Sequence, residues 1–161
     1  MEVEVKELIQ DHVLIVYDIP ATAVKLRASF LQQARAAGAE KHTDSCYFMP
    51  YSEKAMALAQ KLESAGHAVV WGPAHQPDKE KATEMTIRYK DGVTARCSLV
   101  EQRLVMGMTL IAQGKLGIAR RMGIKTGKLL QQLIGIAETY QPQWFMEKLQ
   151  GLVLKWQEVH G

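Results

Sequence analysis

VLIVYDIPATAVKLRASFLQQARAAGAEKHTDSCYFMPY, residues 13–51, is the stretch that decides the fold. It begins with Val13–Val16, a continuous apolar run rich in β-branched residues, which predicts a strand buried on both faces. Pro20 ends this strand, because proline has no N–H for the ladder and fixes its own φ. Asp18 places a carboxylate where the strand ends and a helix begins, so it is the first candidate for a functional residue. The alternative is that Asp18 hydrogen-bonds the free N–H groups at the start of that helix.

The residues after Pro20 predict a helix followed by an extended region. A helix is expected over Thr22–Ala37, with Gly38 closing it as the residue after the C-cap. Residues 40–52 allow two interpretations. Either two short strands are joined by a turn at Thr43–Ser45, or a single bent strand carries a bulge.

The next segment predicts a second helix and another strand. Ser52 is expected to cap a helix over Glu53–Ala65, because its hydroxyl can accept a hydrogen bond from a free N–H of the first turn. His67–Trp71 is apolar and predicts a buried strand, which Gly72-Pro73 should terminate. The order strand, helix, hairpin, helix, strand predicts an α+β fold, a ferredoxin-like βαββαβ sandwich.

The chain changes character after this predicted sandwich. Ala74–Ala82 is polar and contains proline, and it is the candidate boundary. Thr83–Tyr89 alternates polar and apolar side chains, which predicts an edge strand followed by a turn at Asp91-Gly92. We therefore expect a ferredoxin-like domain over residues 1–91 and an all-α C-terminal region over residues 92–161.

The C-terminal region shows helix signals. Ser98–Glu101 fits a capping box, and the helix that it would start should end at Gly114. Pro142 suits the first turn of the last helix. That helix carries an apolar seam for packing on another helix, in this chain or in a second copy. The seam consists of Phe145, Leu149, Leu152, Trp156 and Val159.

A helix-turn-helix pattern lies between these helices. Leu116–Met122 predicts a short helix, Gly123 a turn, and Thr126 the start of a recognition helix. Lys125 and Lys128 would then face phosphates or base edges. The alternative is a helical bundle whose tight turns use glycine and whose cations form a solvated face.

Charge is distributed unevenly along the chain. The net charge is +3 and the isoelectric point is about 8.8, which is too weakly basic to indicate nucleic acid by itself. However, no Asp or Glu occurs from Gln102 to Ala137, so that segment carries +6. Such a segment favours a phosphate-binding surface, with affinity that falls as salt rises. Its cations are Arg103, Lys115, Arg120, Arg121, Lys125 and Lys128.

Compartment signals favour the cytoplasm. Cys46 and Cys97 have no CxxC partner, which is typical of a reducing compartment. The first residues are acidic and amphipathic, unlike a signal peptide. The longest apolar stretch, near Leu104–Ala112, is too short to span a bilayer, so we expect no membrane partner.

The segments VLIVYDIP and GAEKHTDSCYFMP resemble the small ferredoxin-like CRISPR-associated nuclease family, the partner subunits of the spacer-acquisition integrase. The same module occurs in phenylacetate-catabolism repressors and at the start of a chromate-resistance regulator family. The resemblance covers about residues 12–73. It implies a homodimer in which Asp18 binds a divalent metal across the interface, and Mg²⁺ suits a site with one or two carboxylates. The family's chains end soon after the fourth or fifth strand, whereas a long helical region follows here.

Together these features predict a nucleic-acid-binding protein with DNA or RNA on its cations. In one hypothesis it is a Mg²⁺-dependent endonuclease or a CRISPR integration-accessory subunit, with Asp18 as catalytic residue and metal ligand and an integrase-type protein partner. A second hypothesis is a helix-turn-helix transcription regulator with a ferredoxin-like dimerisation domain. A third is a non-enzymatic protein–protein interaction module that docks on an acidic partner.

Overall fold

The computed structural model describes residues 3, 7–65 and 69–161, which form an α+β structure. The chain divides into two compact units, Met1–Lys90 and Asp91–Gly161. Within the described residues the elements are β1 (Asp11–Tyr17), α1 (Val24–Ala36), β2 (Glu40–Thr43), β3 (Cys46–Pro50), α2 (Glu53–Ser64), β4 (Val69–His75), α3 (Lys79–Ala112), α4 (Leu116–Ala137) and α5 (Gln143–His160).

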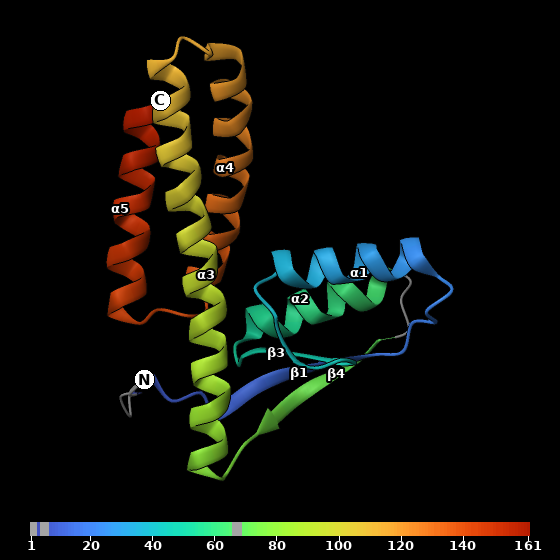
Figure 1. Ribbon diagram of the computed structural model, residues 1–161. Helices are drawn as coiled ribbons and strands as arrows, with labels where there is room; N and C mark the ends of the chain where they lie inside the picture. The colour runs from blue at the N-terminus through green and yellow to red at the C-terminus, as the bar shows by residue number, and fades with distance from the viewer. Residues whose placement is uncertain (1–2, 4–6, 66–68) are drawn as a thin grey trace. The chain divides into compact units, whose positions relative to one another are not determined.

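The first unit is built on a four-stranded sheet with the order β2-β3-β1-β4, in which all neighbours are antiparallel. Helices α1 and α2 lie on one face of this sheet (Figure 1). The side chains of β1 that point to this face are completely or almost completely buried among residues of both helices. They are Val13, Ile15 and Tyr17.

The other face of β1 is only partly covered, so the prediction of a strand buried on both faces is wrong. Val16 is 42% exposed and Leu14 is half-buried. Cover on this face comes from the first turns of α3, where the Tyr89 ring lies 5.9 Å from the ring of Phe48. A single helix covers less of a sheet than a pair of helices does, which leaves Val16 in solvent.

Local signals in the first unit are largely confirmed. Gly38 follows α1 with φ of 88°, as expected of a glycine that ends a helix. The Ser52 hydroxyl accepts a hydrogen bond from the Ala55 N–H at 2.9 Å and so caps α2. The two-strand interpretation of residues 40–52 is also confirmed, with a register irregularity between Lys41 and Thr43.

Strand β4 continues through Gly72-Pro73, so the predicted stop there is wrong. Pro73 lies opposite Val13 in the pairing of β4 with β1. Strand β4 is at the edge of the sheet, so no strand pairs with its outer side. A proline there leaves no hydrogen bond of the sheet without its N–H donor. The start of the predicted strand, residues 67–68, lies outside the described residues.

Helix α3 replaces the predicted edge strand over Thr83–Tyr89 and the predicted turn at Asp91-Gly92. The Asp78 carboxylate starts this helix by accepting hydrogen bonds from the N–H groups of the second and third helical residues. The predicted capping box at Ser98 is wrong for the same reason, because Ser98 lies inside α3. Buried residues recur at helical spacing through this region, namely Ala82, Met85, Thr86, Tyr89, Val93, Cys97, Val100 and Leu104.

The second unit consists of the remainder of α3 with α4 and α5, and Figure 1 shows the three helices packed lengthwise. Helix α3 ends at Ala112, two residues before Gly114, whose φ is +74°. Pro142 is the N-cap of α5, one position before its expected place. The predicted seam is confirmed by the burial of Phe145, Leu149 and Leu152 on α5. No helix within the described ranges is long and apolar enough to cross a membrane.

Candidate nucleic-acid interface

Helix α4 is continuous through Gly123 and Thr126, so the predicted helix-turn-helix is wrong. The Thr126 hydroxyl is completely buried and donates to the Met122 carbonyl at 2.8 Å, as a residue inside a helix can. The short helix, the turn at Gly123 and the cap at Thr126 are therefore absent. The alternative, a helical bundle whose cations form a solvated face, agrees with this structure.

Gly123 serves close helix packing instead of a turn. The Trp156 indole N–H donates to the Gly123 carbonyl at 2.9 Å, and an added Cβ at Gly123 would lie 2.6 Å from His160 Nδ1. Gly127 faces the Trp156 ring, at 3.3 Å from where its Cβ would be. Burial lowers the pKa of His160 from its ordinary value. These contacts hold one side of α4 against α5 and thereby determine which side faces solvent.

The solvent side of α4 carries a row of cations. Arg121, Lys125 and Lys128 have the spacing i, i+4, i+7, which places them within about 60° of one another around the helix. The buried stripe lies roughly opposite. Over residues 119–133 it consists of Ala119, Gly123, Thr126, Leu130 and Leu133. We call Arg121, Lys125 and Lys128 the cationic row.

The other predicted cations flank this row or lie on α3. Lys115 is the N-cap residue of α4, Arg120 is beside Arg121, and both are exposed. Arg103 lies on α3 and is half-buried. The cationic row and these three residues form no ion pair with an acidic group of the described chain. All six lie in the second unit, and their charge is available to an external anion.

Asp18 lies in the first unit, so neither unit contains both Asp18 and the predicted cations. Its side chain is exposed in the segment between β1 and α1. The alternative that it caps α1 is wrong, because the N-cap is Ala23, no side chain caps the helix, and its first turn contains no acidic residue. Where the structure describes the chain, no cluster of three or more His, Cys, Asp or Glu side chains could hold a metal ion.

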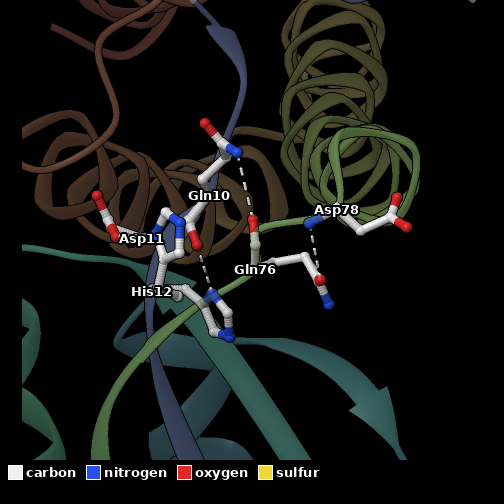
Figure 2. A network of polar contacts seen from close by, with 6 residues as sticks. Gln10, Asp11, His12, Gln76 and Asp78 are labelled. Carbon is white, nitrogen blue, oxygen red and sulfur yellow. Dashed lines mark hydrogen bonds and ion pairs between the residues drawn. The ribbon is translucent and has the colours of Figure 1, made fainter.

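The sequence did not predict the polar network that lies at the end of the sheet. His75 Nδ1 lies 2.6 Å from Asp11 Oδ1, and both line an open hollow of about 370 Å³ beside Tyr51. Figure 2 shows the neighbouring contacts, in which the Gln10 amide donates to the Gln76 carbonyl at 3.3 Å. These contacts fix the ends of β1 and β4 where the chain turns into α3. The pairing of β1 with β4 brings them together, and no motif in the sequence indicates it.

Neither a protein-family model, nor a curated protein, nor a solved structure matches this chain.

Proposed function

We propose that the second unit binds nucleic acid through the solvent side of α4. The cationic row carries this proposal, since Arg121, Lys125 and Lys128 share one side of a continuous helix, are exposed, and form no ion pair with the described residues. A polyanion such as the phosphate backbone matches a row of this kind.

The placement of charge along α4 supports the same conclusion. The N-terminal end of a helix is electropositive and favours acidic residues, whereas the C-terminal end favours basic ones. Helix α4 has Lys115 as its N-cap, no acidic residue in its first turn and no basic residue in its last turn. The cations therefore do not serve the stability of the helix itself. A bound polyanion near the first turns would relieve this unfavourable arrangement.

The proposed binding is to the backbone of nucleic acid. A helix-turn-helix would present the end of a recognition helix to base edges, but α4 presents its side and has no turn at Gly123. Side chains that contact phosphates position a protein without reading sequence. We therefore expect little sequence preference and a strong dependence on salt.

The test is a binding titration of the full-length protein with duplex DNA, single-stranded DNA and RNA over a salt series. The row variant combines Arg121→Ala, Lys125→Ala and Lys128→Ala. The slope of log K against log salt is negative, and the loss of three phosphate contacts should make it less steep by about 2.7 for duplex DNA. The decline in affinity from about 50 to 200 mM salt should then be roughly fortyfold smaller in the variant than in the wild type.

The matched control removes three cations from the first unit with Lys25→Ala, Lys61→Ala and Lys79→Ala. These lysines are exposed and form no ion pair with a described residue. Both variants lose the same net charge, so only a specific role of the row predicts different slopes. Equal slopes in the two variants, or no binding by the wild type at low salt, would refute the proposal.

For the first unit, we propose a ferredoxin-like sandwich that pairs two copies and binds Mg²⁺ between their Asp18 carboxylates. The order β1-α1-β2-β3-α2-β4 and the antiparallel sheet support the fold, and the exposed Asp18 supports the metal. Nuclease activity and an integrase-type partner would follow from the family resemblance.

Asp18→Asn should abolish Mg²⁺-dependent cleavage while retaining the fold. Asp44→Asn, which changes another exposed carboxylate, should leave cleavage unchanged. If the wild type cleaves no nucleic acid with any divalent metal, the proposed nuclease activity is refuted.

A further inference from the structure

An open groove with a largely apolar lining lies beside α5. It has a volume of about 450 Å³ and is lined by Ile134 of α4 and by residues of α5. Leu154 is 59% exposed, Met146 39% and Ile134 37%, so the groove offers apolar surface to a docking partner. Its lining residues on α5 are Gln143, Met146, Glu147, Leu149, Gln150, Val153 and Leu154.

The charge of this groove argues against a polyanion as its occupant. Glu147 is the one charged side chain among the described residues that line it, and no residue of the cationic row takes part. The Glu147 carboxylate accepts a hydrogen bond from the Gln143 amide at 2.9 Å. A phosphate would therefore meet a carboxylate here, whereas a surface of apolar and amide side chains matches the lining.

The exposed side chains on this side of α5 are arranged symmetrically about Gln150. Gln143 and Gln157 lie seven residues before and after it, and Met146 and Leu154 lie four residues before and after it. All five are exposed, and at about 100° per residue they lie within about 80° of one another around the helix. A two-fold axis at Gln150 therefore places amide opposite amide and apolar side chain opposite apolar side chain. Because an amide both donates and accepts, Gln150 can hydrogen-bond its own copy.

Glu147 favours one direction for such a pair of helices. In a parallel pair, Glu147 would lie beside the same carboxylate of the second copy, and the like charges would repel. In an antiparallel pair centred on Gln150, Glu147 lies opposite Val153, and the two carboxylates are separated by about 9 Å along the helices. The antiparallel arrangement therefore has the better electrostatics.

We propose that the occupant of the groove is a second copy of this chain, whose α5 lies antiparallel to the first with Gln150 at the two-fold axis. Met146 packs on Leu154 of the partner subunit, and the reverse contact follows by symmetry. This interface goes beyond the proposed function, since it uses no residue of the cationic row. It also belongs to the second unit, whereas the pairing proposed through Asp18 belongs to the first.

Disulfide cross-linking of the full-length protein tests the register. Under mild oxidation Gln150→Cys should give a covalent dimer, because the axis brings position 150 next to its own copy and a disulfide needs Cα atoms within about 7 Å. Gln157→Cys should cross-link no more than the wild type, since its two copies lie about 21 Å apart along antiparallel helices. An equal mixture of Gln143→Cys and Gln157→Cys should cross-link. All variants keep Cys46 and Cys97, so the native thiols give the same background in each.

Sedimentation equilibrium in EDTA tests the groove itself, because EDTA removes pairing through a metal at Asp18. The groove variant combines Met146→Gln and Leu154→Gln. It should weaken the dimer by about a hundredfold, since each substitution acts twice in a symmetric pair. The control variant combines Val105→Gln and Leu116→Gln, two exposed apolar residues of the same unit outside the groove, and it should associate like the wild type.

Three results would overturn the proposal. The first is a wild type that stays monomeric in EDTA at every concentration, which would leave the groove to a different partner. The second is equal association of the groove variant and the control variant, which would locate the dimer contact elsewhere. The third is equal cross-linking by Gln150→Cys and Gln157→Cys, which would indicate a parallel pair or random collision.

Discussion

Replacing Gly123 by alanine should destabilise the helical unit, whereas the same replacement at Gly135 should stabilise it. Both glycines lie inside α4, so both substitutions gain the same helix propensity, about 0.8–1.0 kcal/mol. They differ in their surroundings. A Cβ at Gly123 would lie 2.6 Å from Nδ1 and 2.7 Å from Cγ of His160, whereas a Cβ at Gly135 would meet no atom within 4 Å.

The magnitude follows from these two effects. Overpacking in a filled site typically costs about 1–3 kcal/mol. After the propensity gain is subtracted, Gly123→Ala should lower the free energy of unfolding by between zero and about 2 kcal/mol. Gly135→Ala should raise it by about 0.8–1.0 kcal/mol. The two variants should therefore differ by about 1–3 kcal/mol.

Urea unfolding followed by circular dichroism measures both free energies, and a second background isolates the cause. In a His160→Ala chain the clash is gone, so Gly123→Ala should become stabilising, as Gly135→Ala is. If Gly123→Ala stabilises the His160-containing protein as much as Gly135→Ala does, the close packing of α4 on α5 described above is wrong.

Three further predictions concern single side chains. Trp156→Phe removes the hydrogen bond to the Gly123 carbonyl and should cost about 0.5–1.5 kcal/mol in urea unfolding. Ser52→Ala removes the cap of α2 and should cost about 0.5–2 kcal/mol by the same measurement. Burial lowers the pKa of His160, so the unfolded chain binds a proton at higher pH than the folded chain does. Stability should therefore fall as pH drops below about 6.5 towards the folded pKa, and His160→Ala should make unfolding free energy less dependent on pH. Some dependence should remain, because burial and the nearby Arg88 also lower the pKa of His42.

Two of these predictions, those for Ser52 and His160, have a contrasting measurement. Ser64→Ala changes an exposed hydroxyl that donates to the Gln60 carbonyl within α2, and stability should change by less than about 0.5 kcal/mol. Equal losses for Ser52→Ala and Ser64→Ala would contradict the capping role of Ser52. An unchanged pH profile in His160→Ala would show that His160 does not contribute to the acid sensitivity.

The candidate interface was partly accessible from the sequence. The acid-free segment is a property of composition along the chain, so it could be recognised without a structure. Which cations share a side depends on whether α4 is interrupted at Gly123, and glycine by itself fits a turn or a close helix contact equally well. The pair of His75 and Asp11 could not be predicted, because its residues are 64 positions apart and meet only when β1 and β4 pair.

The sequence by itself determined the features that depend on neighbouring residues. Gly38 ends α1, Ser52 caps α2 and the seam of α5 is apolar, because caps and periodicity act over one or two helical turns. Only the tertiary structure decided that Thr83–Tyr89 is helical and that Pro73 stays within a strand. A short alternating segment fits a strand or a helix until it has a surface to pack on, and a proline fits a strand only when that strand is at an edge.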